Sequence, residues 1–473
     1  HGAGGGSMRW LVLGSTACST GVIADLPGVD PDPDPDPGAS TFAVAPIAPT
    51  RLAPVPPNVL LVVLDDVGVD QYRQWGAFGA DPAAYPQSPS FDGLVDVGLR
   101  FDEAYAMPLC SASRATLQTG RYPYRHGVGY SLELDDRAGL PDAEVTLAEV
   151  LDGAPIPWST AWLGKWHLSI GTDGWDAPLA QGFDDYAGSI GNLYAKFTSD
   201  GSSQSYRHWE KDVAGELTWV DTYATRDTVN DALDRIATLE PPWLLGVALN
   251  TAHNPYALPP DGTWSGVLLG DDPAHRNYHA MIEDADHALG RLLTHVSLED
   301  TVVIVIGDNG TPSEIATGWE RPARMKGSPY ETGVRVPLVV AGPGVATGVV
   351  RAPVSIADLF PTIAAIADAP LPAAPIDGVD LGPYFADPDH GPVHDTVYAE
   401  TFKPVGLDVP HSHHRRVLRD LDYALVQTLG SPDELYRIDG VVGEGHDLLV
   451  GPRDEEIAAA YDRLLAAMPT PLD

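Results

Sequence analysis

Two pairs of oxygen-bearing side chains each follow a strongly apolar segment of the sequence. They are Asp65 with Asp66 and Asp308 with Asn309. Carboxylate and amide oxygens are the ligands that hard divalent cations prefer. Aspartate and asparagine also favour turns, so either pair alone is consistent with a simple turn. Because both pairs follow the most apolar segments of the chain, the sequence favours a metal site, for Ca²⁺ or Mg²⁺.

A second chemical feature is Cys110, within the sequence PLCSASR. The chain holds 2 cysteines, Cys18 and Cys110, and neither has a CxxC partner, which excludes a disulfide framework and a cysteine-based zinc site. A helix is expected to begin here, and a helix N-terminus lowers the pKa of a thiol. Arg114, one turn later, should point back toward the same place. A lone cysteine is often only a small apolar residue, but these surroundings favour a reactive one.

The elements that must position these residues alternate along the chain. Continuous apolar runs predict strands buried on both faces of a parallel sheet, at 58–64, 243–249, 301–306 and 337–340. Helical patterns are found at 226–239, 275–296 and 355–367, the last with Ser355 as its expected N-cap. This alternation predicts an α/β fold with a doubly wound, mostly parallel sheet flanked by helices. Such sheets bind ligands at the carboxyl ends of their strands, where both acidic pairs would lie.

The pattern changes after about residue 384. Short strands are expected at 397–400 and 423–427, and a final helix is expected at 454–468. We therefore predict a catalytic α/β domain over residues 57–384 and a smaller α+β subdomain over residues 385–473.

The first 56 residues are typical of processing and linker segments. Residues 1–7 read as a tag remnant, and residues 8–18 resemble a bacterial lipoprotein signal with Cys18 as the candidate acylated residue. An ordinary secretory signal or a disordered tail is the alternative. Either signal predicts an exported protein, whether periplasmic, extracellular or held at the cell surface. We expect contact with a membrane only through that lipid anchor, because no segment reaches the ~18–20 apolar residues of a membrane span.

An Asp/Pro-rich linker is predicted over residues 19–56. Its DPDPDPDP run at 30–37 could suggest calcium binding. Proline fixes φ and prevents the chain from wrapping around an ion, so an extended, disordered linker is the better interpretation.

The charge of the chain is strongly one-sided. The 473 residues include 66 acidic and 28 basic side chains, which give a formal net charge of −38. This charge excludes a general attraction to nucleic acid or to anionic membranes. An acidic, lysine-poor surface suits salt-rich surroundings, because salt screens self-repulsion; a composition bias of the lineage is the alternative.

The motifs resemble, in order, those of the formylglycine-dependent sulfatases of the alkaline phosphatase superfamily. The signature of that family, C-x-P-S-R followed by T-G-R, is matched by residues 110–114 and 119–121, with Ala112 where proline is usual. The resemblance extends from about Pro57 to the C-terminus. Its other segments are NVLLVVLDD at 58–66, GKWH at 164–167, HNP at 253–255, GDNG at 307–310, KG at 326–327, ETGVRVP at 331–337 and ELY at 434–436.

The resemblance implies an alkaline phosphatase-like fold and a sulfatase whose nucleophile is made from Cys110. A separate formylglycine-generating maturation enzyme would oxidise the thiol to an aldehyde, whose hydrate attacks the sulfur of a sulfate ester and later expels sulfate. It also implies the other roles. Asp65, Asp66, Asp308, Asn309 and the modified Cys110 would hold Ca²⁺ or Mg²⁺, Arg114 would hold the nucleophile, Lys165 and Lys326 would bind the sulfonate oxygens, His167 would assist sulfate release, and His253 would protonate the leaving alcohol.

Further basic residues are candidates for substrate binding. His126 lies close in sequence to the signature, where a structural role is equally open. Arg415 and Arg416, together with His411, His413 and His414, form the densest basic cluster of the chain, which could attract a sulfated substrate; a solvated loop is the alternative. Export and acidity suit a sulfated carbohydrate as substrate, with aryl sulfates as a second class. The loops expected at 188–219 and 261–272 would set its identity.

Two other functions stay open at this stage. A phosphonate monoester or phosphodiester hydrolase of the same superfamily would use the same aldehyde, but those relatives tend to carry histidine where this chain has Asn309. An exported protein that is never matured would instead bind sulfate or glycan without turnover. The complete set of metal-binding and sulfate-binding residues argues against that reading.

Overall fold

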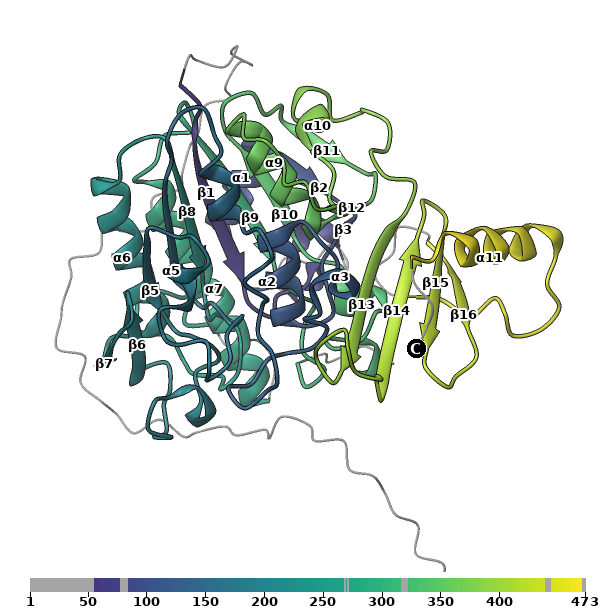
Figure 1. Ribbon diagram of the computed structural model, residues 1–473, viewed down its shortest axis with the longest axis horizontal. Coiled ribbons are helices and arrows are strands. Elements are labelled where there is room, and N and C mark those ends of the chain that lie inside the picture. The colour runs from purple at the N-terminus through teal and green to yellow at the C-terminus, as the bar shows by residue number, and fades with distance from the viewer. Residues whose placement is uncertain are drawn as a thin grey trace, which may run out of the picture.

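The computed structural model of the chain describes residues 55–76, 84–267, 269, 272–315, 322–438 and 444–469 (Figure 1). The predicted tag remnant, the signal segment with Cys18 and nearly all of the linker lie outside these residues and stay predictions. In the described part of the chain, no helix is long and apolar enough to cross a membrane.

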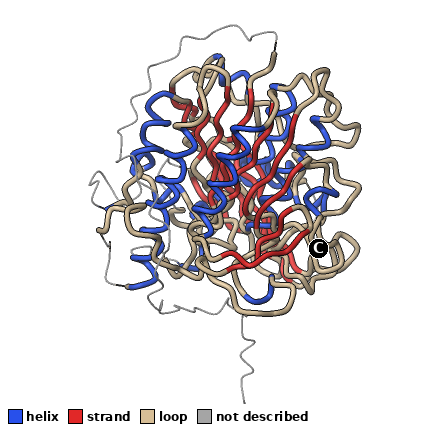
Figure 2. Tube along the Cα trace, turned by 90° about the vertical axis from the view of Figure 1, so that its left-hand side faces the viewer, coloured by secondary structure: helices blue, strands red, loops and turns tan. Residues whose placement is uncertain are grey.

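A ten-stranded sheet forms the centre of the larger domain (Figure 2). Its strands are β1 (Asn58–Leu64), β2 (Leu99–Phe101), β4 (Ser159–Gly164), β5 (Asp185–Gly188), β6 (Trp209–Val213), β7 (Glu216–Val220), β8 (Trp243–Ala248), β9 (Thr301–Gly307), β10 (Leu338–Ala341) and β11 (Gly348–Val350). Their order is β11-β2-β10-β9-β1-β8-β4-β5-β6-β7. The central run from β9 through β1, β8 and β4 to β5 is parallel, whereas β10, β6 and β7 pair antiparallel with their neighbours. The predicted mostly parallel sheet is confirmed.

The first strand shows why the apolar runs become central strands. All seven residues of β1 are buried. Val59, Leu61 and Val63 pack into the hydrophobic cluster on one face of the sheet, and the alternate residues, such as Leu60 and Val62, pack into the cluster on the other face. A strand covered on both faces needs no polar side and therefore reads as a continuous apolar run.

Helices cover both faces of this sheet (Figure 2). On one side lie α1 (Pro89–Val97), α6 (Ala224–Thr238) and α7 (Pro273–Leu293), and on the other side lie α2 (Cys110–Thr119), α4 (Leu147–Leu151) and α9 (Leu359–Ile366). The expected helices at 226–239 and 275–296 are confirmed with small shifts of their ends. The third begins as the 3₁₀ turn η6 (Ile356–Asp358), and Ser355 caps it as predicted, because its Oγ accepts a hydrogen bond from Ala357 N at 3.2 Å.

Shorter elements connect this framework. They are η1 (Val69–Gln71), η2 (Arg73–Trp75), β3 (Ala104–Tyr105), α3 (Pro123–His126), α5 (Ala177–Ala180), η4 (Ala195–Phe197), η5 (Pro322–Arg324), α8 (Glu331–Val334), β12 (Val354–Ser355) and α10 (Gly382–Ala386). Strands β3 and β12 pair as a separate two-stranded sheet.

The C-terminal part forms a separate antiparallel sheet beside the central one (Figure 1). Its strands are β13 (Val397–Lys403), β14 (His413–Arg419), β15 (Tyr423–Thr428) and β16 (Glu434–Arg437), in that order. Helix α11 (Glu455–Ala467) packs against β14 and β15, and Asp454 caps it by accepting from Ile457 N at 2.9 Å. The predicted α+β subdomain is confirmed.

Two segments expected to be loops contain strands. The region 188–219 holds β6 and most of β7, and the basic cluster lies largely in β14. These strands were not predicted because they carry charged residues. Lys211 of β6, for example, is mostly buried, and it pairs with Asp227 and Asp231 at 2.5 Å each. When its partner comes from a neighbouring helix, a buried charged residue cannot be distinguished from an exposed one by sequence alone.

The turn after β4 depends on glycine. Gly164 has φ +86°, and a β-carbon there would lie 2.1 Å from the carbonyl oxygen of Ala248. Lys165 N donates a hydrogen bond to that same oxygen at 2.8 Å. The close approach of β4 to β8 at Gly164 therefore helps to position Lys165.

We expect Gly164→Ala to lower the free energy of unfolding by about 3 kcal/mol or more, because the backbone of β8 must move as well. The matched control is Gly201→Ala: Gly201 has φ +75° but nothing within 4 Å of the added atom, so it should show only the ~1 kcal/mol cost of positive φ. Denaturant unfolding of both variants measures the difference. Equal losses would contradict the close approach between β4 and β8.

Candidate active site

Five neighbouring parallel strands end in polar residues at one edge of the central sheet. Asp66 N donates to Asp308 Oδ1 at 3.1 Å, which joins the ends of β1 and β9 directly. The expectation that the two acidic pairs meet is therefore confirmed. The residues at this edge are Asp65 and Asp66 after β1, Lys165 and His167 after β4, Ser189 and Asn192 after β5, Asn250 and His253 after β8, and Asp308 and Asn309 after β9.

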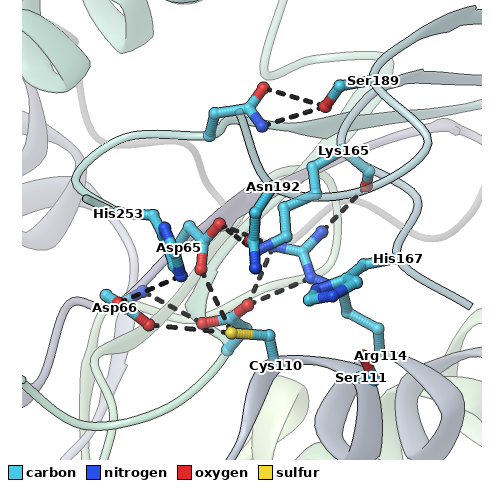
Figure 3. Close-up of polar contacts among 12 residues, drawn as sticks. Asp65, Asp66, Cys110, Ser111, Arg114, Lys165, His167, Ser189, Asn192 and His253 are labelled. Carbon is cyan, nitrogen blue, oxygen red and sulfur yellow. Dashed lines mark hydrogen bonds and ion pairs between the residues drawn. The ribbon is translucent and has the colours of Figure 1, made fainter. Parts of the chain in front are cut away.

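Cys110 faces this edge from the first residue of α2 (Figure 3). Its thiol lies 3.5 Å from Asp65 Oδ1 and 3.7 Å from Asp66 Oδ1, and its side chain is fully buried. Burial raises the pKa of the thiol well above its ordinary range, although Lys165 and Lys326 act in the opposite direction. The expected lowering of this pKa by the helix N-terminus is wrong, because desolvation outweighs it. The unmodified Cys110 is a neutral thiol and not an activated thiolate.

Arg114 points back to the site from the second turn of α2, as expected. Its Nε and Nη2 donate to Asp308 Oδ2 at 3.1 and 2.8 Å, and its Nη1 donates to the backbone oxygen of Lys165 at 2.9 Å. The buried guanidinium thus holds the ends of β9 and β4 against the helix that carries Cys110.

Two lysines pair with the acidic residues after β1. Lys165 Nζ lies 2.5 Å from Asp65 Oδ2, and Lys326 Nζ lies 2.5 Å from Asp66 Oδ1. Lys165 is fully buried, whereas the Lys326 side chain keeps 16% of its surface exposed. Ammonium groups buried this deeply need partner charges, and the two carboxylates supply them.

The carboxylates of the cluster have different proton affinities. Burial alone would raise the pKa of Asp65, but Lys165, His253 and Arg114 hold it well below its ordinary range. Burial and the neighbouring charge of Asp65 raise the pKa of Asp308 to about 7, against the opposing effect of Arg114. The burial of several carboxylates together therefore favours the binding of a further positive charge at this site.

Both histidines of the site are neutral at pH 7. Burial and Lys326 lower the pKa of His253 to about 4, and burial and Lys165 lower that of His167 well below its usual range. His253 Nδ1 lies 2.6 Å from the oxygen of Asn254 and donates to it, so Nε2, 3.8 Å from Asp66 Oδ2, faces the cluster as the proton-exchanging atom. His167 Nε2 donates to Leu132 O at 3.0 Å, and its buried Nδ1 has no hydrogen-bond partner among the described residues.

The donor atoms of this cluster fit a divalent cation. One ligand atom each from Asp65, Asp66, Cys110 and His253 lie within 4.8 Å of one another. Asn309 is buried, and its Oδ1 has no partner in the described part of the chain, which leaves one amide oxygen for a ligand. Asp308 accepts from Arg114 and from Asp66 N, and its carboxylate keeps acceptor sites, so its role as a metal ligand stays a prediction. Such an oxygen-rich set suits Ca²⁺ or Mg²⁺.

The remaining candidates have other partners than this cluster among the described residues. His126 is buried between α2 and α3, where its Nδ1 accepts from Val128 N at 3.1 Å and its Nε2 lies 3.3 Å from Thr116 Oγ1. Burial and Arg121 lower its pKa to about 3, so its environment is that of a structural, neutral histidine.

Arg415 and Arg416 point to opposite faces of the C-terminal sheet, as adjacent residues of a strand must. Arg416 is buried and donates to Gln427 Oε1 at 3.0 and 2.7 Å. Arg415 is half-buried, and its guanidinium lies 5.2 Å from the ring centre of Tyr330. The structure therefore separates the two arginines that the sequence grouped together.

Several polar residues at the edge were missed by the sequence analysis. Ser111 Oγ accepts from Leu132 N at 3.0 Å, next to Cys110. Asn250 Nδ2 donates to Ser189 Oγ at 2.9 Å, and Asn192 is buried with its Oδ1 unpartnered among the described residues (Figure 3). The signal for Ser189 and Asn192 was their place after a strand, but β5 has only four residues and was not recognised.

Comparison with known proteins agrees with this geometry. A family model described as "Sulfatase" matches residues 57–369. The chain is 33% identical to arylsulfatase A of Homo sapiens over 358 residues, which cover 69% of this chain and 67% of that protein. It is 32% identical to N-acetylgalactosamine-6-sulfatase of Homo sapiens over 364 residues, which cover 70% of this chain and 66% of that protein.

The fold is also that of solved sulfatase structures. The structure described as Ps i-CgsB in complex with k-i-k-neocarrahexaose superposes with a TM-score of 0.67 at 23% sequence identity, and the match covers 87% of this chain and 92% of that one. The family match spans the strand ends, Cys110 and both lysines, and the chain therefore belongs to the sulfatase family, whose members are sulfuric ester hydrolases.

Proposed function

We propose that this sulfatase cleaves sulfate esters with a formylglycine hydrate made from Cys110, next to a bound Ca²⁺ or Mg²⁺. The observation that carries the proposal is the convergence of Cys110, Arg114 and two lysines on the buried carboxylates after β1. The thiol itself is buried and neutral, so it would be a poor nucleophile without conversion. The aldehyde hydrate would supply an oxygen nucleophile and a second hydroxyl for the release of sulfate.

Asp65, Asp66, Asp308 and Asn309 are the residues that would hold the cation, together with the modified Cys110. A bound cation would supply Lewis acidity to a sulfate oxygen and to the nucleophilic oxygen. The charges of the chain's own groups support this role. The three carboxylates of Asp65, Asp66 and Asp308 face the three cations Arg114, Lys165 and Lys326, so a divalent ion would make the site net positive and suited to an anion.

The cations of the chain would then act on the substrate. Lys165 and Lys326 would donate to the sulfonate oxygens as charge develops on them, in a buried site where such donors have their largest effect. Arg114 would hold the nucleophilic side chain through its fixed position on α2 and its hydrogen bonds to Asp308. Arg114 is already fixed by its ion pair and its backbone contact, whereas Lys165 and Lys326 would exchange their carboxylate partners for the sulfonate oxygens when a cation binds.

The histidines would move protons. His253 Nε2 faces the cluster without a proton, so His253 would first take one up when the anionic substrate enters, and Nε2 would then deliver it to the leaving alcohol. His167 Nδ1 is an unpartnered acceptor, fixed by the hydrogen bond from Nε2 to Leu132 O, and would take a proton during the release of sulfate.

The substrate that we propose is the sulfate ester of a carbohydrate. The curated relatives are named for aryl sulfates and for sulfated N-acetylgalactosamine, and one similar structure holds a neocarrahexaose. Aryl sulfates are the natural assay substrates for a site of this kind. A separate maturation enzyme and export from the cell belong to the same proposal.

The conversion of Cys110 can be measured directly. In protein made together with a formylglycine-generating enzyme, we expect the tryptic peptide 101–114 to carry CHO in place of CH₂SH at residue 110. Mass spectrometry of that peptide reads the outcome, and Cys110→Ala protein provides the control.

Activity should follow the converted fraction across preparations. An unconverted thiol in fully active protein would refute the proposed nucleophile. Faster hydrolysis of aryl phosphonates than of any sulfate ester would favour the phosphonate hydrolase instead.

The role of Lys326 can be separated from its part in folding, because its side chain is partly exposed. We expect Lys326→Gln to lower kcat for an aryl sulfate by about 100- to 1,000-fold, since it removes one donor to the transition state. Arg463→Gln, which removes an exposed cation of α11 that pairs with Asp420 between β14 and β15, should change kcat by less than about twofold. A Lys326→Gln enzyme with the parent's kcat would remove this lysine from the reaction.

Metal removal should lower both activity and stability. Because a cation that binds only the folded protein stabilises it by RT ln(1 + [L]/Kd), restoring Ca²⁺ or Mg²⁺ at 100 times its Kd should return about 2.7 kcal/mol. Thermal unfolding with chelator and with each ion measures the effect, and Asn309→Ala should weaken the response. An unfolding temperature that changes with neither chelator nor added cation would contradict the metal site.

A further inference from the structure

One face of the C-terminal sheet carries three basic side chains, at the end where β13 leads into β14. Lys403 pairs with His413 across β13 and β14, and Arg415 is the next residue on that face, opposite Thr401. We call Lys403, His413 and Arg415 the basic strip. Paired residues of an antiparallel ladder, and alternate residues of each strand, share a face, so the three side chains project to the same side.

That face contacts the catalytic domain next to Gly129 and Pro329, while the opposite face contacts α3 through Tyr398 and Glu400. Thr401 Oγ1 donates to Gly129 O at 3.0 Å, and Arg419, on the same face of β14, donates to Pro329 O at 3.0 Å. Helix α11 packs against β14 and β15 on the face opposite the strip, where Tyr423 and Arg437 contact its Glu456. The strip therefore faces Tyr130 and Tyr330, in the two segments that lead to Leu132 and Lys326 of the site. His414 and Arg416 lie on the opposite face, where Glu400 and Gln427 contact them.

The charges of the strip are not neutralised. In the described part of the chain, neither Lys403 nor Arg415 forms an ion pair with a carboxylate. Lys403 Nζ lies 4.7 Å from the ring centre of Tyr130, and the Nε of Arg415 is buried without a hydrogen-bond partner. Arg324 shows the contrast, because it shares the Tyr330 ring with Arg415 but pairs with Glu434 and Glu444.

Unpaired cations are unexpected in this protein. The chain has a net charge of −38, so a carboxylate is readily available to most cations. Among the described residues, Lys403 and Arg415 have no carboxylate partner, so their positive potential is available to attract an anionic ligand.

Short stretches of chain connect both ends of the strip to the active cluster. Tyr130, under Lys403, comes two residues before Leu132, whose backbone contacts Ser111 and His167. Two residues span at most about 7 Å between Cα atoms. Tyr330, under Arg415, comes four residues after Lys326, a span of at most about 14 Å. These upper bounds bring the strip within reach of a saccharide whose neighbouring sugar extends from a sulfated group held at Cys110.

We propose that the basic strip binds a second anionic group of the substrate, a sulfate or a carboxylate on a sugar next to the one whose sulfate is cleaved. This inference rests on the proposed function and narrows its substrate to a saccharide with at least two anionic groups. Lys403 and Arg415 supply the charge, the ring of Tyr130 positions Lys403, and His413 lies between the two cations.

The test uses matured enzyme and two disaccharides that share the same cleavable sulfate and differ in one group. One carries a second sulfate on the neighbouring sugar and the other carries none; a third, with a carboxylate there, distinguishes the two anions. We expect the parent enzyme to prefer the doubly anionic compounds. Lys403→Gln combined with Arg415→Gln should lower that preference, the ratio of the two kcat/KM values, by about 10- to 100-fold, mostly through KM.

Arg437→Gln provides the matched control, because it removes an exposed arginine of the same sheet that pairs with Glu456. It should leave the preference unchanged. Lys403→Gln alone, at an exposed position, provides the answer if the Arg415 variant does not fold. An unchanged preference in the double variant would overturn the proposal, and so would an equal loss with Arg437→Gln, which would indicate only the overall field of the protein.

A binding measurement keeps this test separate from catalysis. Cys110→Ser protein should bind the doubly anionic disaccharide more tightly than the singly anionic one, and the strip variants should remove the difference. If matured enzyme cleaves no sulfate ester, the proposed function fails, and this titration still decides whether the strip binds anions.

Discussion

Buried charge is the constraint on which the active edge of this protein depends. Three carboxylates are taken out of water at the ends of two adjacent strands, which is costly unless cations accompany them. The three cations come from three other places in the chain: Arg114 from α2, Lys165 from the end of β4, and Lys326 from the segment after η5. Removing one partner from such a cluster typically costs about 3–5 kcal/mol, because the remaining charge stays buried. The ion pairs therefore hold the helix, the sheet and the loop in one arrangement around Cys110.

The backbone is held in unusual conformations at the same edge. Asp66 and His167 have φ values of 64° and 62°, in the left-handed region that side chains other than glycine seldom adopt. Each comes directly after a strand end, where the chain must turn its side chain back over the sheet. The hydrogen bond from Tyr278 to Asp66 O at 2.7 Å and that from His167 to Leu132 O fix these turns. Strain of this kind persists only where surrounding contacts determine the position, and it is common at functional sites.

The sequence predicted the parts of this structure that depend on local pattern. The run 58–64 reads as a central strand because both of its faces are buried, and the helices beside the sheet carry their own periodicity and caps. Prediction from the sequence failed for features that depend on residues far away in the chain. The pKa of Cys110 is raised by burial beneath segments far away in the chain. Short strands such as β5 are recognisable only from the strands with which they pair. Arg415 and Arg416 looked alike until the register of β14 placed them on opposite faces.

The position of β1 in the sheet has a consequence for the order of events during synthesis. Its neighbours are β8 and β9, which follow it in the chain by well over a hundred residues, and Lys326 comes later still. Cys110 cannot acquire its final enclosure until those segments have left the ribosome. At ~5–20 residues per second, the stretch from Cys110 to Lys326 takes roughly 10 to 40 s to make. An enzyme that needs the side chain of Cys110 must reach it in that interval or before the chain has folded, because afterwards the residue has no exposed surface.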